Sequence, residues 1–261
     1  MKLLWRMLMY PLTFLYCTIT SIRNYLYDRG YWKSFSFDLP VISVGNLTVG
    51  GTGKTPHIEY LIRFLQAQYE LSTLSRGYGR KSRGFRLAQP HDNAQSLGDE
   101  PFQLYQKFGT RIGVAVGEDR VAAIPHLLQE RPQTQIVLLD DAFQHRPIAP
   151  QLNILLTDYG RLFYQDFPFP SGRLRESRRG ARRADVIIVS KCSASLSEAE
   201  KTRIQENIGA YARKDVPVFF TTIAYESPRA AAFSAQQTPC KISLPYFFLL
   251  AWPKINFQKF I

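Results

Sequence analysis

A glycine-rich loop between a predicted strand and a predicted helix constrains this chain more than any other feature. The apolar run 41–44 favours a short buried strand, and residues 57–67 repeat apolar side chains at helical spacing. The loop between them reads G-N-L-T-V-G-G-T-G-K-T-P over residues 45–56. A strand, a glycine loop and a helix in this order are the context of a phosphate-binding P-loop. The alternative is a glycine-rich turn followed by a chance Lys-Thr pair.

The residue types of this loop fit phosphate binding. Glycines let successive backbone NH groups point at phosphate oxygens, and the amino end of the helix adds a positive dipole. Lys54 is expected to reach the β and γ phosphates, and the Thr55 hydroxyl is expected to bind Mg²⁺. Thr48 replaces the first glycine of the G-x-x-x-x-G-K-[ST] pattern, so the loop is a variant. The predicted nucleotide-binding residues are Thr48, Val49, Gly50, Gly51, Thr52, Gly53, Lys54 and Thr55.

A pair of aspartates supports this interpretation. The apolar run 136–139 fits a buried parallel strand and ends in Asp140 and Asp141. P-loop enzymes hold Mg²⁺ with a carboxylate in such a position, so Asp140 and Thr55 are the predicted metal ligands. Ordinary turn chemistry after a strand is the alternative.

The remaining pattern predicts the fold class. Apolar runs favour strands at 71–74, 112–116, 153–157, 186–190 and 218–222. Helical spacing is found at 100–107, 120–129 and 197–211, with Pro125 inside the second of these segments. Alternation of this kind favours an α/β fold, a P-loop NTPase-like, mostly parallel sheet with flanking helices.

The charge balance indicates an anionic partner. The 261 residues hold 33 Lys and Arg against 21 Asp and Glu, a net charge of +12. No nucleic-acid recognition motif is present, so phosphorylated ligands or an acidic membrane surface are favoured. Taken singly, Arg83 and Arg183 are expected to be solvated loop residues. The two basic segments contain Arg76, Arg80, Lys81, Arg83 and Arg86, and then Arg173, Arg175, Arg178, Arg179, Arg182 and Arg183.

Residues 1–27 have a composition that suits a membrane surface. Aromatic and aliphatic side chains dominate, and Arg6 and Pro11 break the apolar run below the length of about 20 residues that a spanning helix needs. No small-residue cleavage site follows, as a secretory signal would require. The prediction is a helix lying in the membrane interface, and the alternative is an amphipathic helix packed on its own domain.

Three further residues and one missing motif bear on the chemistry. Asp99 stands before a predicted helix, where it is either an N-cap or a base acting on a hydroxyl acceptor. His145 is expected beside the carboxyl end of the sheet, where ligands bind, whereas His126 is expected to be structural. The segment 189–193 lacks the Asn-Lys-x-Asp of guanine-nucleotide switch proteins, so ATP is favoured over GTP.

An ordered set of motifs resembles the tetraacyldisaccharide 4'-kinases, which phosphorylate the lipid A disaccharide precursor with ATP. The matching stretches cover most of residues 1–225. They are Val44-Gly45-Asn46, residues 50–56, Leu74-Ser75-Arg76-Gly77-Tyr78-Gly79, Gly98-Asp99-Glu100-Pro101, Val116-Gly117-Glu118-Asp119-Arg120, Asp140-Asp141-Ala142-Phe143-Gln144-His145 and Leu174-Arg175-Glu176.

The resemblance implies roles for these residues. Lys54 and Thr55 would meet ATP and Mg²⁺, Asp140 and Asp141 would lie near the metal, and Asp99 would act as the base. The residues implied around nucleotide and substrate are Arg76, Tyr78, Glu100, Arg120, His145 and Glu176. The resemblance also implies a peripheral position on the cytoplasmic face of the bacterial inner membrane, through a membrane-associated helix at 1–27.

The sequence departs from the family pattern at two places. Ala142 stands where the family usually has glycine, which would strain the turn if a positive φ is needed there. Residues 28–225 match a P-loop kinase core, but residues 226–261 resemble only the remnant of a smaller second domain, as a truncation or frameshift would leave.

The alternative functions are a non-catalytic nucleotide-binding remnant and another metabolic P-loop ATPase or ligase. Acyl-chain preference and oligomeric state stay open.

Overall fold

The computed structural model describes residues 2–224 and 241–242. Its longest helix, α1, runs over Lys2–Asp28. The other helices are α2 (Lys54–Leu65), α3 (Ala94–Leu97), α4 (Asp99–Phe108), α5 (Arg120–Glu130) and α6 (Glu198–Gly209). The strands are β1 (Val41–Asn46), β2 (Leu71–Ser75), β3 (Arg86–Leu87), β4 (Gly113–Val116), β5 (Ile136–Asp140), β6 (Leu152–Asp158), β7 (Val186–Ser190), β8 (Val218–Phe220), β9 (Ile223–Ala224) and β10 (Lys241–Ile242).

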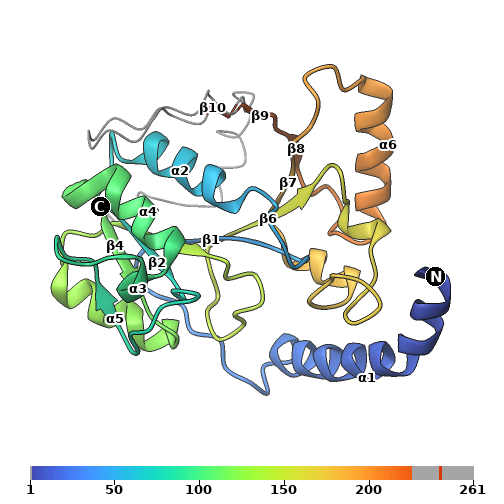
Figure 1. Ribbon diagram of the computed structural model, residues 1–261, viewed down its shortest axis with the longest axis horizontal. Helices are drawn as coiled ribbons and strands as arrows, with labels where there is room; N and C mark the ends of the chain where they lie inside the picture. Colours follow the sequence, from blue (N-terminus) through green and yellow to red (C-terminus); the bar gives the residue numbers. More distant parts are fainter. Residues whose placement is uncertain (1, 225–240, 243–261) are drawn as a thin grey trace.

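An eight-stranded sheet in the order β3-β4-β2-β5-β1-β6-β7-β8 forms the centre of the molecule (Figure 1). Every pair in it is parallel except the β3–β4 pair at one edge. The predicted α/β class with a mostly parallel sheet is confirmed. Each predicted strand is present, β7 with the predicted bounds and the others with ends shifted by one or two residues. The short β3 and α3 had no counterpart in the sequence prediction.

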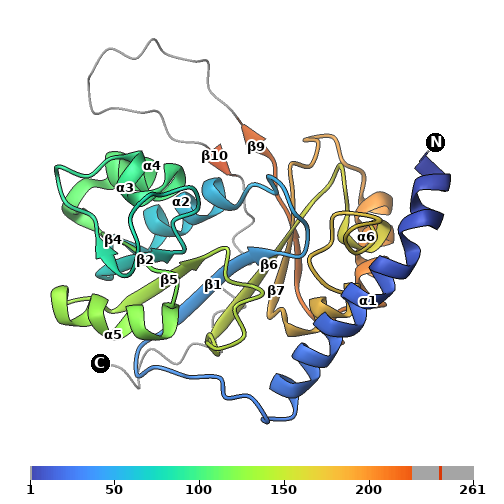
Figure 2. The same ribbon diagram turned by 60° about the horizontal axis from the view of Figure 1, so that its bottom comes forward.

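Side chains of the central strands alternate between two apolar layers, which places helices on both faces of the sheet (Figure 2). On β5, Leu138 packs in the layer under α2 and α4, whereas Leu139 packs in the layer under α5. On β7, Ile188 joins the first layer and Ile187 packs with α6. Because helices cover both faces, a ligand is expected outside the carboxyl ends of the parallel strands, where open α/β sheets bind ligands.

Helix α1 continues past Pro11 and lies against the domain along one face. Thr13 and Ser171 share a hydrogen bond of 2.6 Å between their hydroxyls, and the Tyr16 hydroxyl donates to the Arg175 carbonyl at 2.6 Å. The alternative of packing on its own domain is therefore correct for this face.

The opposite face of α1 is apolar and exposed. Within the described residues, no helix combines the length and hydropathy needed to cross a bilayer. The exposed large side chains are Leu8, Tyr10, Leu12, Phe14, Leu15, Ile19, Ile22 and Tyr25.

The predicted domain remnant at 226–261 lies outside the described residues, apart from β10. This strand pairs antiparallel with β9.

Candidate active site

The phosphate loop leaves β1 and enters α2 with the backbone that an anion site needs. Gly53 adopts φ 81° at the N-cap of α2, and no side chain caps the helix. The first NH groups of α2 are therefore left without a side-chain acceptor, which is the usual arrangement at a phosphate-binding helix end. Gly50 also has a positive φ, of 122°, in a conformation that residues with a Cβ rarely adopt.

Polar contacts fix the loop from beneath. The buried Thr52 hydroxyl accepts from Asn46 Nδ2 at 2.8 Å, and Lys191 Nζ donates to the Gly51 carbonyl at 2.5 Å and to Asp158 Oδ2 at 2.7 Å. Sequence reasoning missed Lys191 because its role depends on how β1, β6 and β7 lie side by side in the sheet. The lysine lies directly after the buried strand β7, which was the available signal.

The second basic segment lies beside the loop as a strand-like partner. Thr48 forms an antiparallel bridge with Leu174, the Val49 NH donates to the Arg173 carbonyl at 2.8 Å, and the Arg175 NH donates to the Leu47 carbonyl at 2.7 Å. This pairing brings Arg175 to the phosphate loop although the two segments lie far apart in the chain.

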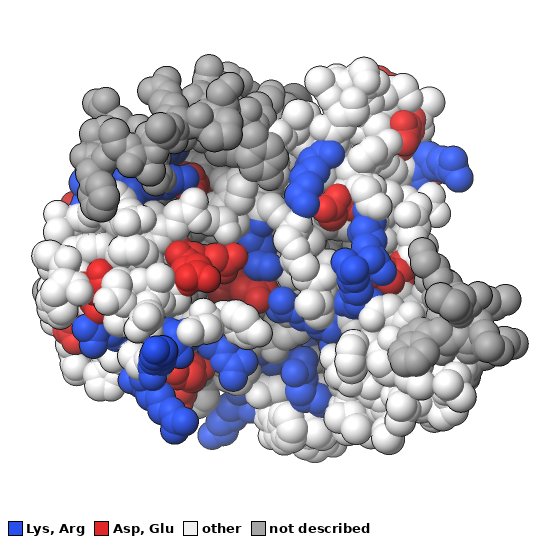
Figure 3. Space-filling model, in the orientation of Figure 1, with Lys and Arg blue, Asp and Glu red and all other residues white. Residues whose placement is uncertain are grey.

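A cavity of about 850 Å³ opens beside the loop at the carboxyl ends of the strands. Val49 and Lys54 are the loop residues that line it. In Figure 3 acidic side chains gather in the middle of this face, with basic side chains around them. The other predicted residues that line the cavity are Arg76, Tyr78, Asp99, Glu100, Arg120, Asp140, Asp141 and His145.

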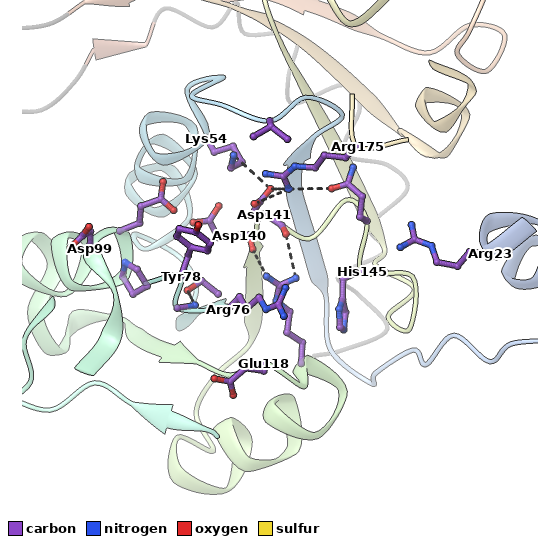
Figure 4. A pocket seen from close by; sticks show the side chains of 17 residues that line it. Arg23, Lys54, Arg76, Tyr78, Asp99, Glu118, Asp140, Asp141, His145 and Arg175 are labelled. Atoms are coloured by element: carbon purple, nitrogen blue, oxygen red, sulfur yellow. Dashed lines mark hydrogen bonds and ion pairs between the residues drawn. The ribbon is translucent and has the colours of Figure 1, made fainter. Parts of the chain in front are cut away.

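The two aspartates at the end of β5, Asp140 in the strand and Asp141 after it, have different environments (Figure 4). Asp140 is buried, and burial raises the pKa of its carboxyl to about 7, with Glu100 and Asp141 adding repulsion and Lys54 and Arg120 opposing it. Asp141 is more exposed. Arg175 Nη1 lies 2.9 Å from both of its carboxylate oxygens, and Lys54 Nζ lies 3.6 Å from one of them.

The oxygen atoms beside the loop fit Mg²⁺. Asp140 Oδ1 is buried without a hydrogen-bond partner among the described residues, and the Thr55 hydroxyl donates to Glu100 Oε1 at 3.3 Å. In the part of the chain that the structure describes, no three His, Cys, Asp or Glu side chains form a metal cage. Mg²⁺ in phosphate-transfer sites uses one or two carboxylates with phosphates and waters. The donor set therefore fits this ion better than one that needs a full protein cage.

Asp99 and Glu100 begin α4, and in Figure 4 Asp99 lies on the side of the cavity away from Asp141. Both are exposed, and both line the cavity. The N-cap position of α4 belongs to Gly98, and Asp99 is the first helical residue. The N-cap interpretation of Asp99 is therefore wrong, and its carboxylate is not engaged in capping.

Arg120 and His145 lie on the wall formed by the Asp140–Asp141 turn. The buried Arg120 donates to the Asp140 carbonyl at 3.2 Å and to the Asp141 carbonyl at 3.3 Å, so it holds the turn that presents both carboxylates. Burial, followed by the positive charge of Arg120, lowers the pKa of His145 to about 4. His145 is therefore neutral near pH 7, and its Nε2 has no partner among the described residues.

Comparison with known proteins identifies the family. The model of the tetraacyldisaccharide-1-P 4'-kinase family matches residues 5–243. The chain belongs to this family. Tetraacyldisaccharide 4'-kinases of Flavobacterium psychrophilum and Flavobacterium johnsoniae are 54% and 52% identical to it, and each alignment covers 85% of this chain. The chain spans 64% of the length of both relatives.

A solved structure of the same kinase family shares the fold. The crystal structure of LpxK from Aquifex aeolicus in complex with ATP is similar with a TM-score of 0.72 and 32% identity, over 84% of this chain and 65% of that one.

The family resemblance placed Glu176 beside the ligands, but this residue does not line the cavity, so the prediction is corrected. It is fully buried, where it accepts from Arg183 at 2.6 Å, from Asn24 at 2.6 Å and from Gln144 at 3.1 Å. Its carboxylate therefore joins α1 to the cavity wall instead of facing a ligand. The prediction that Arg183 is a solvated loop residue is also wrong, because this buried ion pair holds it. Arg83 is exposed, as expected.

The strain expected at Ala142, where the family usually has glycine, is not present, because Ala142 does not adopt a positive φ. The residue with a positive φ in this turn is Asp141, at 48°. Aspartate tolerates this conformation better than most residues with a side chain, because its short polar group can bond locally. Ala142 therefore needs no glycine-like freedom.

His57, which sequence analysis did not select, is buried beneath the phosphate loop. Its Nδ1 lies 2.6 Å from the Gly53 carbonyl and its Nε2 lies 3.1 Å from the Thr221 hydroxyl. Burial lowers the pKa of His57 to about 4. The helical position of His57 on the buried face of α2 was the only signal in the sequence.

We expect His57 to make stability depend on pH in the acidic range. The unfolded state binds a proton below a pH of about 6.5, whereas folded His57 resists protonation until about 4, so acid favours unfolding. Between pH 7 and pH 5 the free energy of unfolding should fall by about 2 kcal/mol more in the wild type than in His57→Gln. Urea titrations at both pH values measure this difference, with His126→Gln, an exposed histidine, as control. An equal fall in wild type and His57→Gln would contradict the assignment.

Proposed function

We propose that this chain transfers the γ-phosphoryl group of MgATP to the 4'-hydroxyl of the tetraacyldisaccharide 1-phosphate precursor of lipid A. The observation that carries this proposal is the cavity itself, which Lys54 and the Asp140–Asp141 pair line together with Asp99 and Glu100 of α4. Membership of the kinase family and the named activity of its relatives support it. The ATP complex of the similar Aquifex aeolicus protein supports ATP as the donor.

In this mechanism the phosphate loop binds the donor. The NH groups at the start of α2 and the ammonium of Lys54 hold the β and γ phosphates, and the Lys54–Asp141–Arg175 contacts keep the ammonium oriented. Thr55 and Asp140 would hold Mg²⁺, which when bound neutralises charge that develops on the transferred group.

Asp99 acts as the base toward the acceptor. Its carboxylate takes the proton of the 4'-hydroxyl while the oxygen–phosphorus bond to the sugar forms and the bond to the β-phosphate oxygen breaks, with ADP as the leaving group. The remaining cavity residues position the reactants. Arg76 and Tyr78 are exposed at the rim, where they can contact substrate, and Arg120 keeps the Asp140–Asp141 turn in place.

The partner surface in this proposal is an anionic membrane, on the cytoplasmic face of the inner membrane. The exposed apolar face of α1 would lie in the acyl boundary of the bilayer. An acylated acceptor is held in that same layer, so the helix would bring the cavity to its substrate.

A transfer assay in mixed detergent micelles tests the proposal. With MgATP labelled at the γ position, we expect label to appear in the acceptor lipid and ADP to form only when acceptor is present. Binding of MgATP without transfer would favour the non-catalytic remnant. Phosphorylation of a water-soluble acceptor in preference to the lipid would favour a different metabolic P-loop enzyme.

A further inference from the structure

One basic side chain of the membrane-facing helix reaches the cavity. Arg23 belongs to α1, and it lines the same cavity as Lys54 and Asp99. In Figure 4 its side chain extends from the helix toward the centre of the site, on the side away from Asp99. Among the described residues of α1, Arg23 is the one that lines the cavity.

Within the described part of the chain, Arg23 forms no ion pair. Its Nη2 donates to the side-chain oxygen of the adjacent Asn24 at 3.3 Å, and its buried Nε has no partner there. The nearby acids are already engaged, since Asp28 pairs with Arg146 at 2.6 Å and Glu176 pairs with Arg183 at 2.6 Å. Arg23 therefore presents a guanidinium whose positive charge no carboxylate of the described residues neutralises.

The other basic groups of the cavity lining differ from Arg23. Arg76 also has no ion pair among the described residues, but it lies exposed at the rim. Lys54 and Arg175 both contact the Asp141 carboxylate, and Arg120 donates to backbone carbonyls. Desolvating a guanidinium without a partner is costly, so an unpaired one at a cavity wall is typical of a site for an anionic ligand.

The position of Arg23 is fixed relative to the phosphate loop. Tyr16 bonds to the Arg175 carbonyl, and Asn24 donates to Glu176 at 2.6 Å, so α1 is attached on both sides of Arg23 to the segment that pairs with the loop. Arg23 of α1 and Asp99 of α4 lie on opposite sides of the cavity in Figure 4. A ligand that reacts near Asp99 and extends toward α1 would meet Arg23 at its far end, next to the exposed apolar face.

We propose that Arg23 binds the phosphate that the acceptor already carries, and so selects a phosphorylated acceptor. The inference rests on the proposed function. A guanidinium can bind a phosphate through two parallel hydrogen bonds, and such charge-assisted bonds are strong when partly buried. The acceptor of this family is a disaccharide 1-phosphate, whose 1-phosphate lies at the opposite end from the reacting 4'-hydroxyl.

The experiment compares two acceptors and two variants of the full chain. Wild type, Arg23→Gln and Arg23→Lys are assayed in neutral detergent with the disaccharide 1-phosphate and with the same lipid lacking that phosphate. We expect Arg23→Gln to raise KM for the phosphorylated acceptor about tenfold to a hundredfold with little change in kcat, and to leave the dephosphorylated acceptor unaffected. Arg23→Lys should restore part of the preference. Arg29→Gln, which removes an exposed charge just after α1, is the matched control.

Two outcomes would overturn the inference. One is a wild type that does not distinguish the two acceptors, and the other is an Arg23→Gln variant that keeps the full preference. Binding to phosphatidylglycerol vesicles separates the two sources of phosphate, because loss of vesicle binding with an unchanged acceptor preference would assign Arg23 to membrane headgroups instead. Calorimetry with MgATP accompanies each variant. If the wild type binds no MgATP, the proposed function fails. Direct binding of the two acceptors to wild type and Arg23→Gln, measured by calorimetry in the same detergent, then decides the role of Arg23.

Discussion

Lys54→Ala is expected to reduce kcat/KM for phosphoryl transfer by about 10²- to 10³-fold, as does removal of other preorganised groups that stabilise developing charge. Lys54 is the lysine among the described residues that line the cavity, and its ammonium lies 3.6 Å from Asp141 Oδ1. Lys54 is the first residue of α2, whereas the neighbouring cation, Arg175, is engaged by both oxygens of the Asp141 carboxylate. Steady-state assays with γ-labelled MgATP measure the loss.

Stability should change little in the same variant. The Lys54–Asp141 pair is partly exposed, with 10% and 33% of the two side chains accessible, and such a pair contributes about 0–1 kcal/mol. Lys201→Ala, which removes an exposed lysine paired with Glu198 on α6, is the matched control and should retain activity. Activity of Lys54→Ala equal to that of this control would remove the assignment of residues 48–55 as the phosphate loop.

Asp140→Asn is expected to abolish transfer and to stabilise the protein in the absence of ligand. The carboxylate is buried, one of its oxygens has no partner in the described chain, and burial raises its pKa to about 7. An amide removes the buried charge while nearly keeping the shape. The free energy of unfolding at pH 8 should therefore rise by about 1–3 kcal/mol.

The pH dependence of this gain has a definite sign. The pKa of Asp140 is higher in the folded state than in the unfolded state. Between about pH 4 and pH 7 the folded wild type therefore binds a proton that the unfolded chain does not bind. Its free energy of unfolding falls as pH rises through this range. The advantage of Asp140→Asn should then be largest above pH 7 and vanish near pH 4. Urea unfolding at several pH values measures it, with Asp215→Asn on an exposed turn as control. If Asp140→Asn were less stable than the wild type at pH 8, the buried Asp140 carboxylate would not be a destabilising charge in the protein without ligand.

Local sequence determined the elements of the site well. The apolar runs before Gly45 and before Asp140 placed two strand ends, and parallel strands end at one edge of a sheet, so the loop and the aspartates could be expected to meet. Asp99 was also placed at the start of a helix, although excluding the N-cap role needed the position of Gly98.

Contacts between distant segments could not be predicted in the same way. The resemblance placed Glu176 beside ligands, but its carboxylate is buried with Arg183 and Asn24, and Asn24 is 152 residues away in the chain. Arg23 showed only the spacing of a charged residue on an amphipathic helix, and its approach to the cavity follows from the docking of α1 on residues 171–176.

By itself, the sequence of this protein determined which segments form strands and helices, and which residue types end the strands beside the loop. Periodicity and glycine placement act over a few residues, so they can be read locally. Only the tertiary structure decided which charges are paired, which are buried and which face the cavity. Those outcomes depend on segments that meet only after the sheet has assembled and brought α1, the phosphate loop and residues 171–176 together.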